Sequence, residues 1–356
     1  MNEAIVDLAT PEDDEGIRAL LRKQTMPGRV RLALCREPDF SIGCAATGSD
    51  YRIVVARSVE RGEIVGVACR SARHVFLNGR EQRLGYLGQL RVDERFRGRW
   101  LISRGFSLLQ GLDRDDPLPA YLASIVEGNT EATGVLVSKR RRCFPAFREV
   151  ARYRTLALRT PRPRAALSGD AEIVRASLEQ LPDLVTFLRA QGPRYQLFPV
   201  WTEDTFRRLD SLGLKLEEIR IARRGRSIAG IAGFWDQTAY KQAVVRGYGG
   251  WLRLVAPILP RIGRQIRTAY AALLCIADDD PHVFGRLLRE LYNCAAHGKF
   301  DYLLVGLDAR DPLLRIAGAY PHVSYPSRLY LGTWSHGGSL HEAPDDRLAR
   351  VDIATL

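Results

Sequence analysis

One order of predicted strands and helices occurs twice in this chain, and this repetition points to a duplicated α/β architecture. A short apolar strand and a helix cover residues 4–24, and the same pair returns at 172–191. A β-hairpin is predicted next in each half, at 51–68 and at 218–233. Each half then continues with a strand, a helix, a strand, a short helix and a last β segment. The spacing of about 168 residues is too long for a solenoid and indicates a tandem domain duplication.

A segment rich in proline, glycine and charge separates the two halves, as is typical of an exposed linker. We expect an α/β fold with a mixed (α+β) sheet in each of two tandem domains. The total of 356 residues is ample for two domains that each bury a core. The predicted boundaries are an N-terminal domain at 1–158, a linker at 159–170, a C-terminal domain at 171–334 and a loose polar tail at 335–356.

The cysteines and the apolar runs favour a cytoplasmic protein. The six cysteines are scattered, with no CxxC pair, which is typical of reduced thiols. No apolar run approaches the length of about 18 residues that spans a bilayer, so we expect no membrane partner. The first residues contain acids and no apolar core of a signal peptide.

The formal charge of +12 comes almost entirely from arginine. A basic balance suits either nucleic acid or a polyanionic small molecule. The simplest explanation of the charge is a compositional bias toward arginine on a solvated surface. Because the basic residues lie along the whole chain rather than in one stripe, nucleic acid is the weaker alternative. The histidines lack the partners of a zinc site, and we expect no metal.

The segment most informative about chemistry is an apolar strand at 84–92, followed by a basic turn and a helix from about residue 101. A turn that opens a helix presents backbone N–H groups without helical partners, and together with the helix dipole these groups suit a diphosphate. Arg95, Arg97 and Arg99 add cationic donors for phosphate oxygens. A solvated basic turn is the simpler alternative.

This segment resembles motif A of the GNAT (GCN5-related N-acetyltransferase) superfamily. The family pattern Arg/Gln-x-x-Gly-x-Gly/Ala falls on residues 97–102, after a strand that ends in Leu90-x-Val92. Arg97 matches the pattern, whereas Trp100 and Ile102 stand where the family has small residues. Glycine lets phosphates approach the backbone closely, so Trp100 must point away from them or it narrows the site.

A second match lies downstream, where the strand 121–126 is followed by Asn129 and Ala132. In GNAT proteins an Asn at this place contacts the pantetheine arm of acyl-CoA, although Asn129 also suits a plain helix cap. The resemblance implies acetyl-CoA or another acyl-CoA as co-substrate. The residues that it assigns to cofactor binding are Leu90, Arg91, Val92, Arg97, Gly98, Arg99, Trp100, Leu101 and Asn129.

The resemblance also implies direct attack of an amine on the thioester. Such a reaction needs a base, an acid for the leaving thiolate, and a backbone N–H that holds the developing oxyanion. The strand residues 90–92 would supply that N–H group. The usual tyrosine acid of the family is replaced by Leu136.

The remaining candidates for the catalytic groups are side chains near the ends of the two strands. Glu127, and more weakly Glu94, could act as the base, and Tyr86 and Ser124 are further polar groups there. A surface carboxylate or a hydroxyl in the core is the simpler explanation of each residue.

The second half carries aspartates, Asp278 to Asp280, in the turn that holds arginines in the first half. Carboxylates repel a diphosphate, and these acids are explained as a helix N-cap cluster. We therefore expect that the second half has lost the cofactor site and completes the acceptor cleft.

Three functions remain open from the sequence. The first is an N-acyltransferase that acts on a small-molecule or protein amine. The second is a non-catalytic tandem GNAT protein that binds a ligand as a sensor. The third is an aminoacyltransferase that uses charged tRNA, which the positive charge permits.

Overall fold

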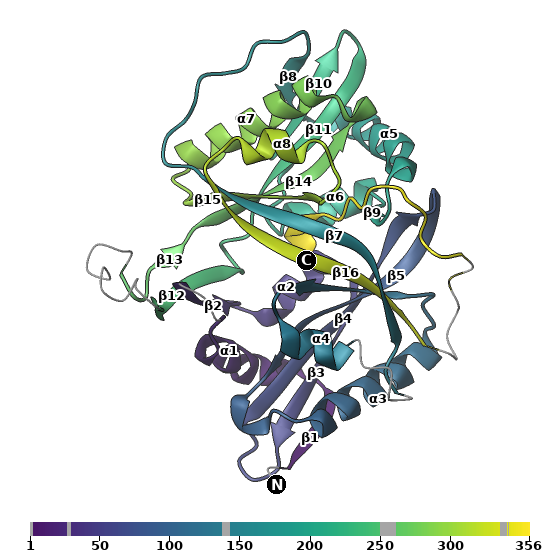
Figure 1. Cartoon of the computed structure of the whole chain (residues 1–356), viewed down its shortest axis with the longest axis vertical. Coiled ribbons are helices and arrows are strands. Elements are labelled where there is room, and N and C mark those ends of the chain that lie inside the picture. Colours follow the sequence, from purple (N-terminus) through teal and green to yellow (C-terminus); the bar gives the residue numbers. More distant parts are fainter. Residues whose placement is uncertain (1–2, 27–29, 137–142, 250–260, 335–339, 341) are drawn as a thin grey trace.

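The first half follows the expected order of elements in the computed structural model (Figure 1). The structure describes residues 3–26, 30–136, 143–249, 261–334, 340 and 342–356. The helices and strands of the first half are β1 (Ala4–Leu8), α1 (Asp14–Lys23), β2 (Val30–Cys35), α2 (Phe40–Thr47), β3 (Asp50–Ser58), β4 (Ile64–Leu77), β5 (Arg80–Val92), α3 (Arg99–Asp115), β6 (Tyr121–Val126), α4 (Thr130–Leu136) and β7 (Ala146–Arg159).

The second half repeats this order with two additional strands, β12 and β13, and both predicted hairpins are confirmed as β3–β4 and β10–β11. The helices and strands of the second half are β8 (Glu172–Arg175), α5 (Leu181–Gln191), β9 (Phe198–Pro199), α6 (Glu203–Asp210), β10 (Ile219–Arg224), β11 (Ser227–Asp236), β12 (Gln242–Tyr248), β13 (Gln265–Ile266), β14 (Thr268–Ile276), α7 (Pro281–His297), β15 (Tyr302–Asp308), α8 (Leu314–Gly318) and β16 (His322–Thr333).

Most of the described strands join one mixed sheet that runs through both halves (Figure 1). Its order is β1-β3-β4-β5-β6-β16-β7-β15-β14-β11-β10-β8, and β9 pairs with β4. A smaller sheet, β13-β12-β2, also combines strands of the two halves. Because the sheet is continuous, the division into domains at 159–170 stays a prediction.

The two halves exchange their last strands at the centre of the sheet. β7 of the first half pairs with β15 of the second, whereas β16 of the second half pairs with β6 of the first. β7 and β16 also pair with each other over their whole lengths. Each half therefore completes its sheet with a strand that the other half supplies.

Helices cover both faces of the sheet in the first half, as the alternation of its strands requires. Ile17, Leu20 and Leu21 of α1 recur at helical spacing and pack with α2 against Val55 of β3 on one face. On the other face, α3 packs against β3 and its neighbours. The apolar side of α3 thus lies directly behind the strands that lead to the basic turn.

The prediction of a loose tail is wrong for residues 349–355, which are largely buried. The Tyr153 hydroxyl donates to the carbonyl of Val351 at 2.5 Å, and Asp352 accepts from the backbone N–H of Leu273 at 3.0 Å. The apolar residues that alternate with polar ones in this segment pack into the core, which the overall polarity of residues 335–356 concealed.

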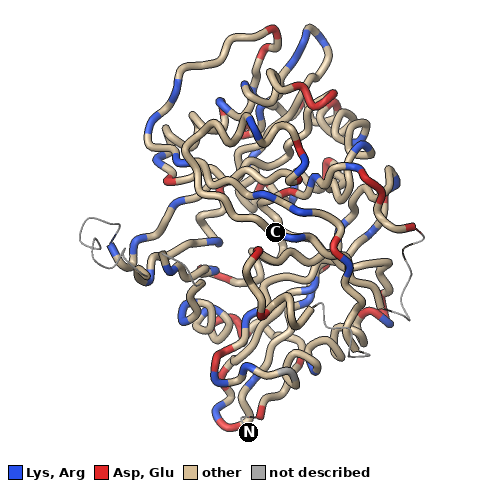
Figure 2. The backbone as a smooth tube through the Cα atoms, viewed as in Figure 1, with Lys and Arg blue, Asp and Glu red and all other residues tan. Residues whose placement is uncertain are grey.

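The structure also bears on the cysteines, on membrane-spanning helices, on metal binding and on the distribution of charge. All six cysteines are free; Cys143 and Cys294 are partly exposed and the others are buried. None of the described helices combines the length and apolarity needed to cross a membrane. In the same part of the chain, no three His, Cys, Asp or Glu side chains gather as a metal site. Lys and Arg are spread over the whole backbone among Asp and Glu (Figure 2).

Candidate active site

A β-bulge interrupts strand β5 where the sequence places the oxyanion-binding backbone. Two residues of β5, Gln89 and Leu90, lie opposite the single residue Ala68 of β4. Gln89 has a φ of 58°, a left-handed conformation that few residues other than glycine adopt.

Strands β5 and β6 separate beyond their first contacts. They pair in parallel at only two positions, Gly85 with Tyr121 and Tyr86 with Leu122. Both strands continue, β5 to Val92 and β6 to Val126. The backbone groups of β5 past Tyr86 therefore have no strand partner on the β6 side among the described residues. Backbone groups left without a partner in this way are able to bond a ligand.

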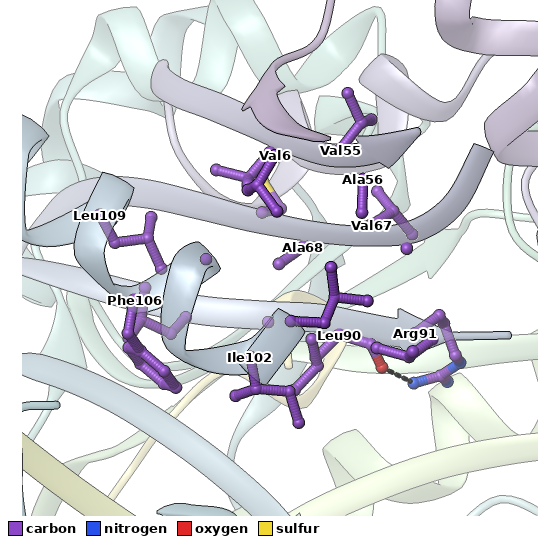
Figure 3. A pocket seen from close by; sticks show the side chains of 18 of the residues that line it. Val6, Val55, Ala56, Val67, Ala68, Leu90, Arg91, Ile102, Phe106 and Leu109 are labelled. Atoms are coloured by element: carbon purple, nitrogen blue, oxygen red, sulfur yellow. Dashed lines mark hydrogen bonds between the residues drawn. The ribbon is translucent and has the colours of Figure 1, made fainter. Parts of the chain in front are cut away.

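An apolar pocket of about 100 Å³ lies between α3 and the strands β3, β4 and β5, with Ala123 of β6 also in its lining (Figure 3). Leu90, Arg91, Val92 and Leu101, all predicted to bind the cofactor, line this pocket. Arg91 is its only charged residue and donates to the carbonyl of Leu90 at 2.8 Å. The other lining residues are Val6, Val54, Val55, Ala56, Gly66, Val67, Ala68, Cys69, Leu87, Gly88, Ile102, Gly105, Phe106, Leu109, Ala123 and Leu136.

The sequence analysis missed most of these lining residues. Small residues on facing elements, such as Gly66 and Ala68 of β4 and Gly105 of α3, are the signal that could have indicated the space. Leu136, which stands where the family has its tyrosine acid, lies at this pocket as well.

Gly98 is the N-cap of α3; it has an extended φ of −177° and no side chain to cap the first turn. The first N–H groups of the helix therefore have no side-chain cap, an arrangement that suits an anion. Arg97 lies next to this turn, and its side chain is half-exposed. Its guanidinium group lies 3.4 Å from the carboxylate of Glu94 and 3.6 Å from that of Glu131. Both contacts are ion pairs, but neither is close to the usual hydrogen-bond distance of about 2.9 Å, and the exposed Arg97 can reorient toward a phosphate.

The other two arginines of the turn differ from Arg97. Arg95 pairs with Asp93 and with Glu63, both at 2.9 Å, so it holds the turn together. The side chain of Arg99 lies outside the described part of the structure.

Trp100 lies beside the start of α3 and outside the pocket. A Cβ atom built on Gly98 would be 3.2 Å from Cδ1 of Trp100. The indole packs against the cluster of Ala4 and Phe96, and Arg104 lies over its ring at 5.2 Å. The indole therefore narrows the space at Gly98 but leaves the pocket behind α3 open.

Three other predicted residues lie near the ends of β6 and do not line the pocket. Asn129 caps α4, since its Oδ1 accepts from the N–H of Ala132 at 3.0 Å. Glu127 lies 3.5 Å from Arg328 of β16. Ser124 is half-buried on β6.

Tyr86 is the predicted polar residue that lies deepest, at the point where β5 and β6 separate. It is 6% exposed, and a Cβ atom on Gly88 would be 3.1 Å from its hydroxyl. Burial raises the pKa of Tyr86 to about 12. The phenol is therefore protonated at neutral pH and can act as a proton donor.

The second half has the same strand separation, but its own chain fills it. β14 and β15 pair only from Thr268 to Tyr270, and Leu273 has a φ of 56°, like Gln89 in the first half. Asp352 bonds the N–H of Leu273, and a Cβ atom on Gly306 of β15 would be 2.8 Å from Ile353. The C-terminal segment thus occupies the place that corresponds to the open site of the first half.

In the acidic turn of the second half, Asp280 caps helix α7 and Asp279 bonds neighbouring side chains. Asp280 accepts from the N–H groups of His282 and Val283, which confirms its role as the N-cap of α7. Asp279 instead accepts from Arg194 at 2.9 Å and from the hydroxyl of Tyr195 at 2.5 Å.

The fold resembles several solved acyltransferase structures. A GCN5-related glucosamine N-acetyltransferase region of a fungal multi-domain β-N-acetylglucosaminidase matches 93% of the chain with a TM-score of 0.61 and 12% identity. The match spans only 38% of that protein. A GCN5-related N-acetyltransferase from Sphaerobacter thermophilus matches 96% of the chain and 98% of its own length, with a TM-score of 0.57 and 13% identity.

Saccharomyces cerevisiae N-myristoyltransferase with bound myristoyl-CoA matches 97% of the chain and 94% of its own length, with a TM-score of 0.55 and 11% identity. No protein-family model matches the sequence, and neither does any curated protein sequence. At these identities the likeness establishes the fold, and it confirms the fold expected from the sequence.

Proposed function

We propose that this chain, which has the tandem GNAT fold, transfers an acyl group from acyl-CoA to a primary amine. The observation that carries the proposal is the separation of β5 from β6 at a bulge, next to an apolar pocket. This arrangement places unpaired backbone donors beside a space for an acyl chain. The uncapped start of α3 adds a place for the diphosphate.

The proposed reaction is direct attack of the amine nitrogen on the thioester carbonyl carbon. The backbone at Gln89 and Leu90 holds the developing oxyanion. As the carbon–sulfur bond breaks, the thiolate receives a proton, for which Tyr86 is the proposed donor. The nitrogen loses its proton to a base, and Glu127 remains the candidate for this role.

The pocket favours an acyl group longer than acetyl. Its lining is apolar apart from Arg91, and burial of each CH₂ group stabilises a bound chain by about 0.8 kcal/mol. One similar structure, the yeast N-myristoyltransferase, holds myristoyl-CoA. We therefore place a medium or long acyl chain ahead of acetyl for this protein.

A non-catalytic role as an acyl-CoA-binding protein is the second candidate. Leu136 favours it, because it brings an apolar side chain to the pocket at the position of the family's tyrosine acid. Calorimetry with octanoyl-CoA tests binding for both candidates. Release of free thiol in the presence of a panel of amines then supports the enzyme, whereas binding without release supports the second candidate.

An Arg97→Ala variant is expected to bind acyl-CoA about tenfold more weakly, because one charge-assisted contact to phosphate is lost at an exposed position. Calorimetry at two salt concentrations measures the change, and the variant should also show a weaker salt dependence. Arg152→Ala is the control. Arg152 is also exposed but lies on β7, and this variant should bind acyl-CoA as tightly as the unmodified chain. Equal affinity of both variants and the unmodified chain would place the diphosphate elsewhere.

A further inference from the structure

Four cations from separate elements converge where the two halves meet. Arg36 follows β2, Arg73 lies on β4, Arg91 lies on β5 and Lys241 precedes β12. Gln242 of β12 pairs with Cys35 of β2, which brings Lys241 beside Arg36, and Arg36 bonds the side chain of Gln89 on β5, two residues from Arg91. The charges of Arg36, Arg73 and Arg91 all act on the hydroxyl of Tyr86 and oppose the rise of its pKa. We call these four residues the cation cluster.

No member of the cation cluster forms an ion pair with a carboxylate of the described residues. The contacts of Arg36 are the carbonyl of Cys35 at 2.9 Å and Oε1 of Gln89 at 3.1 Å. Lys241 lies over the ring of Tyr270 at 4.6 Å. Neutral groups of this kind orient a cation without balancing its charge.

One donor nitrogen of Arg73 has no acceptor among the described residues. Its Nη1 bonds the hydroxyl of Thr355, whereas its Nη2 is buried and has no hydrogen-bond partner in the described structure. A buried charged donor without an acceptor is costly, and such an atom calls for a ligand or a special role.

Asp352 lies near the cation cluster, but it accepts hydrogen bonds from backbone N–H groups instead of from the cluster. Asp352 interacts electrostatically with Arg73 and Lys241, yet its two oxygens accept from the backbone N–H groups of Leu273 and Ala354, each at 3.0 Å. Burial raises the pKa of Asp352, whereas its backbone hydrogen bonds and the charges of Arg73 and Lys241 oppose the rise. One carboxyl group near four basic side chains leaves the cluster with more cations than anions among the described residues.

The four cations of the cluster are also largely shielded from solvent. Arg36 is only 4% exposed, and Arg73, Arg91 and Lys241 are half-buried. Burial is the main cause that lowers the pKa of each of the latter three.

The guanidinium groups outside the cluster that are as deeply buried as that of Arg36 have carboxylates within 4 Å. Arg350 lies 2.6 Å from Asp311, and Arg70 lies 3.4 Å from Asp116. Arg36 differs from these groups because it has no described carboxylate partner, and an uncompensated buried charge is destabilising unless an anion binds there.

We propose that the cation cluster binds an anionic group of the acceptor, so that the acceptor is an amine that also carries a carboxylate or a phosphate. This inference rests on the proposed function. Gln89 connects the two sites, because it forms the bulge at the expected thioester and accepts from Arg36. An anion held by Arg36, Arg73 and Lys241 would direct the amine of the same molecule toward that bulge.

The test compares matched amines with octanoyl-CoA as donor. Glycine is paired with glycinamide, and phosphoethanolamine with ethanolamine, and thiol release gives kcat and KM for each. The anionic member of at least one pair should be preferred about tenfold or more in kcat/KM, and the pair that shows this preference distinguishes carboxylate from phosphate. Equal or better use of the neutral members would overturn the proposal while the acyltransferase function stands.

A Lys241→Gln variant should raise KM for the preferred anionic amine about tenfold and leave the neutral amine and the Kd of octanoyl-CoA unchanged. Lys241→Arg, which keeps the charge, should restore most of the preference. Arg246→Gln, at an exposed position on β12, is the matched control and should behave like the unmodified chain. An equal loss for both kinds of amine would show that Lys241 has only a structural role and would contradict the proposal.

Calorimetry with the amines alone keeps the two proposals apart. If no amine releases thiol but the anionic amine still binds in a manner that depends on Lys241, the acyltransferase function fails and the anion site remains. If the anionic amine neither binds nor reacts, the anion site fails.

Discussion

A Gly105→Leu variant is expected to bind a long-chain acyl-CoA about a hundredfold more weakly than the unmodified chain while remaining folded. Gly105 lines the apolar pocket from α3, and a Cβ atom there would meet nothing within 4 Å. A leucine can therefore enter the pocket without a clash and exclude part of the acyl chain. Loss of burial for three or four CH₂ groups amounts to about 3 kcal/mol, which corresponds to about a hundredfold in Kd.

Gly111→Leu is the matched control on the same helix. A Cβ atom at Gly111 also meets nothing within 4 Å, but the residue does not line the pocket. Both substitutions should favour the helix by a few tenths to about 1 kcal/mol, because glycine is a poor helix former. Calorimetry with myristoyl-CoA and thermal unfolding measure the two effects. A similar loss of affinity in both variants would show that the acyl chain does not lie in this pocket.

An Arg350→Met variant is expected to lower the free energy of unfolding by about 3–5 kcal/mol. Arg350 is 3% exposed, and its guanidinium lies 2.6 Å from Asp311, whose side chain is fully buried. Methionine fills much of the same volume but leaves that carboxylate without its counter-charge. Urea denaturation measures the loss.

The pH dependence gives a second check on this ion pair. Burial raises the pKa of Asp311 even in the presence of Arg350, so removal of Arg350 should raise it further. An acid whose pKa is higher in the folded than in the unfolded chain binds more protons when folded, so falling pH stabilises the folded state. The deficit of Arg350→Met should therefore shrink as the pH is lowered, and Asp311→Asn in the same chain should recover part of it at neutral pH. A deficit below about 1 kcal/mol, or one that grows in acid, would contradict this account.

The local elements could be predicted from the sequence, but the pairing of the last strands could not. The hairpins and helix α7 follow from alternation, turn residues and helical spacing within short windows. The sequence of β7 has the same alternation whether its neighbour is β6 or β15, because only the burial of each face is encoded locally. The exchange depends on contacts between residues far apart in the chain.

The candidate site also contains some residues that could be predicted from the sequence and others that could not. Leu90 to Val92 and Leu101, which the sequence assigns to cofactor binding, lie together at the pocket, since a strand followed by a turn and a helix fixes their neighbourhood. The cation cluster escaped notice because Arg36 and Lys241 come from distant segments. Arg73 also did not stand out, because the apolar run of β4 is already interrupted by Arg70 and Ser71.

The strand exchange also has a consequence for biosynthesis. During translation the first half emerges early, yet the edge of β6 can be sealed only after β16, the last of the described strands, has left the ribosome. Until then an open strand edge invites pairing with neighbouring nascent chains. Ribosome stalling or premature termination within the second half should therefore yield aggregates rather than a functional N-terminal fragment.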